Sequence, residues 1–95
     1  MASTKEYLTY VLDLLREVKG ISYKKMMGEY ILYKGETIFG GVYDDRFLIK
    51  NTKSSKLLGF SGQIPYPGAK PMFLVDSENA EEIKEIVDKV YEDLQ

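Results

Sequence analysis

The stretch ISYKKMMGEYILYKGETIFGGVYDDRFLIK, residues 21–50, decides the fold. Tyrosines and β-branched residues alternate with polar residues along it, and a period of two is typical of half-buried strands. Lys34-Gly35-Glu36 and Asp44-Asp45 interrupt the alternation, and glycine and aspartate tolerate the positive φ of tight hairpin turns. Connections this short leave no room for a parallel crossover. The stretch predicts antiparallel strands at residues 22–27, 29–33, 37–43 and 46–50.

Helical periodicity precedes this stretch. Apolar residues recur at intervals of three and four between Leu8 and Val18, which predicts an amphipathic helix over residues 4–19. Ser3 and Glu6 have the spacing of a capping box, in which each side chain accepts a backbone N–H at the start of the helix.

The remainder of the chain predicts a short helix, one strand and a final helix. The short helix begins after Thr52 or Ser54, and the apolar run 72–75 predicts the strand. Asp76 or Ser77 would cap the final helix, whose buried stripe is Ile83, Val87, Val90 and Leu94. We therefore expect a single domain over residues 1–95 with an α+β fold. It would be a two-layer sandwich of a mostly antiparallel sheet of about five strands, with helices at both termini and a short helix between strands four and five.

The composition argues against most small enzymes. The 95 residues contain no cysteine and no histidine, which excludes thiol nucleophiles, disulfides, Ser-His-Asp triads and metal sites built on Cys or His. We expect a non-enzymatic protein without a cofactor or a bound metal. The chain shows no secretory signal and no apolar run near the ~20 residues that span a bilayer, so we expect a cytoplasmic protein that does not bind membranes.

The net charge of −2 is divided unevenly. Residues 1–70 hold eleven Lys/Arg and seven Asp/Glu, whereas residues 71–95 hold two Lys and eight Asp/Glu. A basic face on the body of the protein is compatible with this division, as is an ordinary acid-rich exposed helix.

Two short motifs allow a chemical and a structural interpretation. Paired carboxylates such as Asp44-Asp45 can hold Mg²⁺, but this pair also fits a hairpin turn. Gly40-Gly41 could cradle a phosphate, yet no GxGxxG or P-loop spacing surrounds it. We therefore predict a turn at Asp44-Asp45, and a bulge or a close backbone approach at Gly40-Gly41.

The segment PYPGAKP, residues 65–71, predicts a rigid loop. Prolines restrict its backbone, so Tyr66 and Lys70 would be presented at low entropic cost. One interpretation of the loop is a stiff turn that leads into the next strand. The alternative is a partner-binding surface formed by Tyr66, Lys70, Arg46 and Lys24, the last two at the sheet edge.

Nucleic-acid binding is a second hypothesis. Lysines and tyrosines are interleaved in the first 60 residues, and such mixtures suit phosphate contacts and base stacking. Lysines on exposed sheet edges would explain the same pattern. The candidate residues are Lys24, Lys25, Lys50, Lys53 and Lys56.

Three segments in the same order resemble the N-terminal domain of the TfoX/Sxy family. They are KMMGEY at 25–30, IFGGVYDDR at 38–46 and PYPGAKPM at 65–72. The opening residues 3–12 and the acidic final helix are also similar, so the resemblance covers nearly the whole chain.

The resemblance implies a bacterial cytoplasmic protein of two-layer α+β fold that regulates transcription. Founding members of the family are competence coactivators that work with the cyclic-AMP receptor protein, and they also carry a helical C-terminal domain. These 95 residues match the N-terminal domain alone, so we expect a free-standing version of it. The family supplies no catalytic residues. The resemblance thus implies a protein partner, either the transcription machinery or a regulator. Nucleic acid is an alternative partner, and a homodimer through a strand edge is possible.

Overall fold

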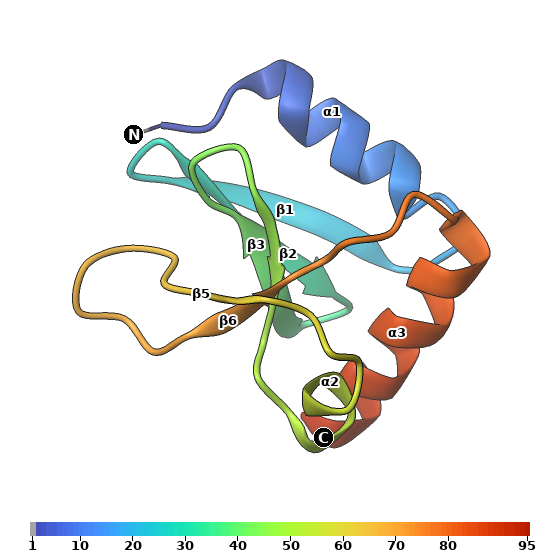
Figure 1. The fold of residues 1–95 in the computed structure, drawn as a ribbon. Coiled ribbons are helices and arrows are strands. Elements are labelled where there is room, and N and C mark those ends of the chain that lie inside the picture. Colours follow the sequence, from blue (N-terminus) through green and yellow to red (C-terminus); the bar gives the residue numbers. More distant parts are fainter. Residues whose placement is uncertain (1) are drawn as a thin grey trace.

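An antiparallel sheet forms the centre of the fold in the computed structural model, which describes residues 2–95. Within these residues the sheet has six strands in the order β1-β2-β3-β4-β6-β5 (Figure 1). Every pair of neighbouring strands is antiparallel. The elements are α1 (Lys5–Leu14), β1 (Ile21–Met26), β2 (Glu29–Lys34), β3 (Thr37–Val42), β4 (Phe47–Ile49), α2 (Lys53–Lys56), β5 (Gly62–Gln63), β6 (Met72–Leu74) and α3 (Ala80–Asp93).

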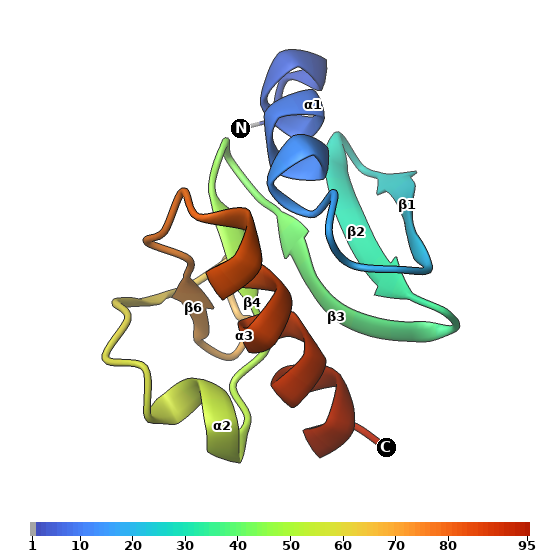
Figure 2. The same ribbon diagram turned by 90° about the vertical axis from the view of Figure 1, so that its right-hand side faces the viewer.

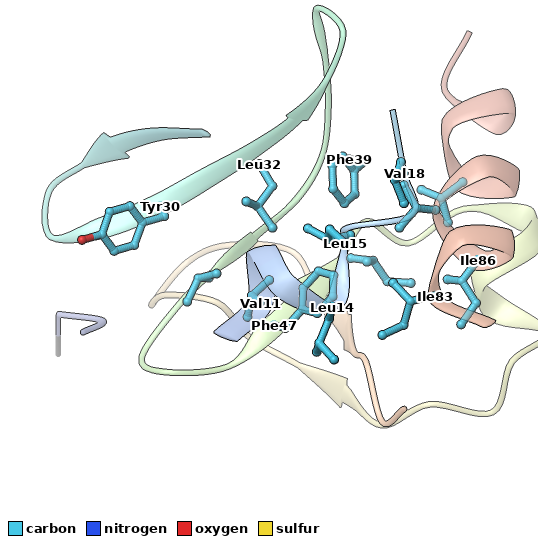
Figure 3. Close-up of a cluster of buried hydrophobic side chains, with 14 of the residues drawn as sticks. Val11, Leu14, Leu15, Val18, Tyr30, Leu32, Phe39, Phe47, Ile83 and Ile86 are labelled. Carbon is cyan, nitrogen blue, oxygen red and sulfur yellow. The ribbon is translucent and has the colours of Figure 1, made fainter. Parts of the chain in front are cut away.

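Helices α1 and α3 cover one face of the sheet, and Figure 2 shows both in front of it. The apolar core lies between the two layers (Figure 3). From the helices it takes Val11, Ile83 and Val87, and from the sheet Leu32 and Phe39, all 0% exposed. The α+β fold with helices at both termini is therefore confirmed, as is the short helix α2, which packs against α3.

The start of α1 differs from the prediction. Thr4, not Ser3, is the N-cap, and its hydroxyl oxygen accepts the N–H of Tyr7. The Ser3 hydroxyl instead donates to the Glu29 carboxylate over 2.6 Å. The capping box of Ser3 and Glu6 was therefore wrong, because a carboxylate brought close by the fold competes for the serine.

Helix α1 is also shorter than predicted. It ends at Leu14, and turns continue the chain to β1 at Ile21. Leu15 and Val18 are nevertheless buried, at 1% and 7% exposure. The apolar pattern thus identified the buried side chains correctly. Residues at that spacing can, however, be buried by turns as well as by a helix.

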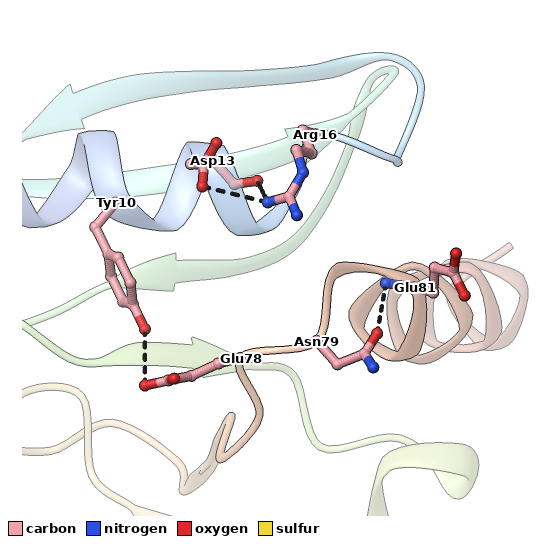
Figure 4. A network of polar contacts seen from close by, with 6 residues as sticks. All are labelled: Tyr10, Asp13, Arg16, Glu78, Asn79 and Glu81. Carbon is pink, nitrogen blue, oxygen red and sulfur yellow. Dashed lines mark hydrogen bonds and ion pairs between the residues drawn. The ribbon is translucent and has the colours of Figure 1, made fainter.

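The cap of α3 lies further along than predicted. Asn79, rather than Asp76 or Ser77, accepts the N–H groups of Glu81 and Glu82, at 2.9 and 3.1 Å. Figure 4 shows the hydrogen bond between Asn79 and Glu81. The predicted stripe is confirmed at Ile83, Val87 and Val90, while Leu94 is partly buried.

The sheet has one strand more than the predicted count of about five. Strand β5 has only two residues and pairs with β6 through Gly62↔Phe73 and Gln63↔Met72. So short a strand leaves no alternating pattern in the sequence.

Candidate functional site

The face of the sheet opposite α1 and α3, here called the open face, carries its own row of side chains. Strand register aligns Lys24 with Ile31, Ile31 with Gly41, and Gly41 with Leu48. Paired residues in an antiparallel sheet point to the same face, and Leu32 beside Ile31 points to the helices. Leu48 is fully buried although it lies outside the cluster beneath the helices. The open face is therefore partly covered by something other than a helix.

The cover is the loop of residues 64–71 between β5 and β6. In Figure 1 it projects to the left, on the side away from α1 and α3. Loop residues Tyr66 and Lys70 and strand residue Ile38 line the same hollow. The loop therefore extends over the open face.

Two features of the structure constrain the conformation of this loop. Ala69 donates its N–H to the Tyr66 carbonyl over 3.1 Å, and Gly68 has a φ of +88°. Proline followed by a residue of positive φ is the sequence of a type II turn, which Tyr66-Pro67-Gly68-Ala69 forms.

Arg46 holds the base of the loop. Its guanidinium donates to the side-chain oxygen of Gln63 over 3.2 Å and to the carbonyls of Ile64 and Pro65 over 3.2 and 3.5 Å, while its Nε donates to the Tyr43 carbonyl. All three nitrogens of the guanidinium thus stabilise the protein's own backbone and side chains. Arg46 positions the loop rather than extending into solvent.

Tyr43 and Tyr66 form the contact between the sheet and the loop. Their ring centroids lie 6.1 Å apart with an interplanar angle of 49°. Tyr43 is 8% exposed, and a Cβ on Gly41 would lie 2.5 Å from its ring. The ring therefore rests on bare glycine backbone. Burial raises the pKa of the Tyr43 hydroxyl above its usual range, and the neighbouring Tyr66 raises it further.

Two hollows flank this tyrosine pair, and both tyrosines line each of them. The larger, of about 600 Å³, is bounded on its other side by Met26, Met27 and Ile31. The smaller, of about 340 Å³, lies towards Lys50 and Lys70. Met27 is 97% exposed and Tyr66 58%. The open face is thus an apolar surface with a tyrosine ridge between two depressions.

A hydrogen-bonded cluster closes one end of the open face. The Glu29 carboxylate accepts the N–H and hydroxyl of Ser3 and the N–H of Asp44. Asp44 and Asp45 both have a φ of +52° in the β3–β4 turn, and Asp45 accepts the N–H of Thr4. The predicted turn is confirmed. Residues 2–95 contain no group of three or more side chains that could hold a metal ion.

The glycine pair is confirmed as a close backbone approach. A Cβ on Gly40 would lie 2.3 Å from the Leu48 carbonyl oxygen, and the β2–β3 register shifts between Leu32 and Tyr33. The approaching groups are the backbone of the neighbouring strands at Leu48 and Tyr30 and the ring of Tyr43.

The structure separates the predicted site residues into groups. Tyr66 and Lys70 share the smaller hollow, and Lys24 lies on the open face beside Ile31. Lys25 pairs with Tyr30 and so points to the opposite face from Lys24. Of the remaining nucleic-acid candidates, Lys50 lines the smaller hollow, whereas Lys53 and Lys56 lie on α2. The five lysines are thus spread over three parts of the fold.

The sequence interpretation missed Met26, Met27, Ile31 and Tyr43. The signal for the methionines is the dipeptide Met27-Gly28, which forms the two-residue β1–β2 turn with φ of +52° and +85°. A two-residue turn of this kind exposes its first side chain. Ile31 and Tyr43 could not be recognised, because their importance depends on the loop that crosses the open face.

None of the helices in residues 2–95 is long and apolar enough to span a membrane. No family model matches the chain. The chain is, however, similar to the uncharacterized 12.7 kDa protein in the trpE 5' region of Spirochaeta aurantia. The two are 33% identical over 78 residues, which cover 80% of this chain and 68% of the spirochaete protein. The chain belongs to the same family as this uncharacterized protein.

Proposed function

We propose that the protein is a non-enzymatic binding module that acts through protein–protein contact at the open face. The observation that carries the proposal is Tyr66, an aromatic side chain 58% exposed on a loop that Arg46 and a type II turn hold rigid. Aromatic anchors on rigid loops are favourable binding elements because little conformational entropy is lost when a partner docks.

The setting we propose is transcription regulation in the bacterial cytoplasm, with a component of the transcription machinery as the partner. This part of the proposal rests on the resemblance to the TfoX/Sxy N-terminal domain. The three segments that carry the resemblance include the β1–β2 turn, the β3–β4 turn and the loop over the open face. They therefore coincide with the surface that Tyr66 occupies.

Site-specific cross-linking tests the proposal. A photoreactive phenylalanine analogue at position 66 is expected to join the protein to a discrete partner in living cells. The matched control is position 57, because Leu57 is 83% exposed but lies at the end of α2. Failure to form an adduct at position 66, or the same adduct at both positions, would contradict the proposed surface.

Direct nucleic-acid binding, the alternative function, has less support. Its candidate lysines are divided between the two faces of β1, the smaller hollow and α2. The Ser54 N–H of α2 also donates to the α3 carboxylate of Asp93. Titration of a labelled duplex at about 50 and about 200 mM salt separates the two functions, since phosphate contacts make affinity fall steeply with salt.

A further inference from the structure

The open face and α3 differ in charge. Lys24 lies on the open face, and Lys50 and Lys70 line its smaller hollow. Helix α3 lies against the other face and exposes Glu81, Glu82, Glu85, Glu92 and Asp93. The lysines of the open face therefore outnumber Glu29, the carboxylate that lines its larger hollow, and the exposed carboxylates of α3 outnumber its exposed Lys84 and Lys89. Such a separation of charge steers a partner of complementary charge.

Two carboxylates near the open face, those of Glu29 and Asp45, accept hydrogen bonds from the protein itself. Glu29, which lines the larger hollow, accepts hydrogen bonds from Ser3 and Asp44. Asp45 accepts the N–H and hydroxyl of Thr4. Asp44 lies at the tip of the β3–β4 turn and, with Glu29 and Pro67, lines a third hollow of about 350 Å³. The ammonium groups of Lys50 and Lys70 therefore line the smaller hollow, whereas the charged residue that lines the larger hollow is Glu29, whose carboxylate is hydrogen-bonded to Ser3 and Asp44.

The shape of the open face suits a chain segment. A compact ligand would fill only one hollow. Because Tyr43 and Tyr66 separate the two hollows, a ligand that fills both must have apolar groups on each side of this tyrosine pair. Methionine side chains such as Met26 and Met27 adapt to apolar side chains of different shapes. The longest extent of the molecule is 29 Å, so about nine extended residues, at about 3.3 Å each, cross the whole face.

We propose that the open face binds an acidic amphipathic segment of a partner protein. Apolar side chains of the segment occupy the two hollows on either side of Tyr66, and its carboxylates lie near Lys24, Lys50 and Lys70. This inference rests on the proposed function and specifies the chemistry of its partner.

Labelled probe peptides of about nine residues test the inference with the full chain. The first carries two leucines and a phenylalanine between glutamates. The second has lysine at every glutamate position, and the third has alanine at the three apolar positions. Fluorescence anisotropy is expected to show at least about tenfold weaker binding for the second and third probes, and weaker binding of the first as salt increases. Equal affinity for the acidic and basic probes, or no binding of the acidic probe, would overturn the inference.

Charge-reversal variants test where on the protein the acidic probe binds. Lys70→Glu and Lys24→Glu are each expected to weaken the acidic probe several-fold, because a like charge then faces its carboxylates. Lys89→Glu is the matched control, since Lys89 is exposed on α3 and the change in net charge is the same. Thermal melts establish that each variant is folded. Equal losses in all three variants would show a non-specific charge effect and overturn the assigned site.

The outcomes separate this inference from the proposed function. If position 66 forms a cross-link but the protein shows no preference for the acidic probe, the proposed protein partner stands and its acidic character is contradicted. If the protein binds a DNA duplex and both Lys70→Glu and Lys24→Glu abolish that binding, the occupant of the open face is nucleic acid instead. If the molecular mass in solution rises with protein concentration, and Tyr66→Ala restores the mass of the monomer, the occupant of the open face is a second copy of the chain. Each of these results overturns the acidic segment as the occupant.

Discussion

The rings of Tyr43 and Tyr66 lie 6.1 Å apart, yet Tyr43 is 8% exposed and Tyr66 58%. One member of the pair is therefore part of the protein interior and the other part of its surface. The same residue type contributes to stability at one position and is available for contact at the other.

Alanine substitutions separate these contributions. We expect Tyr43→Ala to lower the free energy of unfolding by about 3 kcal/mol, in the range of buried aromatic truncations. Tyr66→Ala should lower it by less than about 1 kcal/mol, because most of that ring is exposed. Urea denaturation followed by circular dichroism measures both. A loss at Tyr66 as large as that at Tyr43 would show that the loop is part of the folding core.

Glu29 ties the N-terminal segment to the turn of β3 and β4. Its carboxylate accepts hydrogen bonds from Ser3, at 2.9 Å from the N–H and 2.6 Å from the hydroxyl, and from the Asp44 N–H. We expect Glu29→Ala to cost about 2–3 kcal/mol of unfolding free energy, because charge-assisted hydrogen bonds are lost and partly buried donors are left without partners. Glu81→Ala, an exposed residue in the first turn of α3, is the control. Equal losses in the two variants would contradict the role of the cluster.

Gly40 and Gly62 provide a comparison of the same substitution at two places in the sheet. At Gly40 a Cβ would lie 2.3 Å from the Leu48 carbonyl oxygen, whereas at Gly62 it would meet nothing within 4 Å. We expect Gly40→Ala to cost about 3 kcal/mol, since backbone must move to accommodate the methyl group. Gly62→Ala should change stability by no more than about 0.5 kcal/mol. Thermal denaturation checks the difference, and equal melting temperatures would contradict the close strand approach.

Asp93 introduces a pH dependence at the junction of α2 and α3. The N–H of Ser54 donates to its carboxylate over 2.8 Å, and this hydrogen bond lowers the pKa of Asp93 below its usual value. The folded state therefore binds fewer protons than the unfolded state near that value. The stabilisation is present above about pH 4 and is lost as the pH falls through the folded pKa. We expect the stability difference between wild type and Asp93→Ala to shrink from pH 6 to acidic pH, as measured by urea denaturation. A difference that stays constant with pH would contradict this contribution.

The sequence predicted the sheet well because its strands are joined by tight turns that particular residues demand. Gly35 and the pair Asp44-Asp45 all adopt positive φ, as a hairpin turn at these positions requires. The helix ends were predicted less well. Ser3 was assigned to a local cap but hydrogen-bonds to Glu29, which is 26 residues away in the chain. Local spacing cannot reveal a competitor that only the fold brings close.

The basic residues show the same limit at the candidate site. Lys34 and Arg46 look alike in the sequence as exposed cations between aromatics. In the structure Lys34 Nζ lies 5.2 Å from the ring centroid of Tyr91 and 3.9 Å from a carboxylate oxygen of Asp88, both on α3. The Arg46 guanidinium donates hydrogen bonds to Gln63 and Ile64 at the base of the loop. Which cations remain available to a partner depends on tertiary packing, and a single sequence does not encode that directly.

Arg46 also allows loop rigidity to be tested apart from global stability. Arg46→Met removes the donors to Gln63, Ile64 and Pro65 but keeps an apolar stem of similar length. We expect a modest cost of about 1–2 kcal/mol. Hydrogen exchange should show a larger local effect, in which the Ala69 amide, bonded to the Tyr66 carbonyl, exchanges faster than the loss of global stability accounts for.

The matched control is Arg16→Met, because Arg16 is exposed just after the end of α1 and its guanidinium bonds to the carboxylate and carbonyl of Asp13. It should leave the Ala69 amide unchanged. If Arg46→Met loosens the loop, cross-linking at position 66 should also decline, because a mobile Tyr66 must be ordered again when the partner docks. Unchanged protection of Ala69 in Arg46→Met would show instead that the Pro67-Gly68 turn holds the loop without the arginine. Tyr66 would then owe its position to the turn alone, and the cation would serve only the junction between β4 and β5.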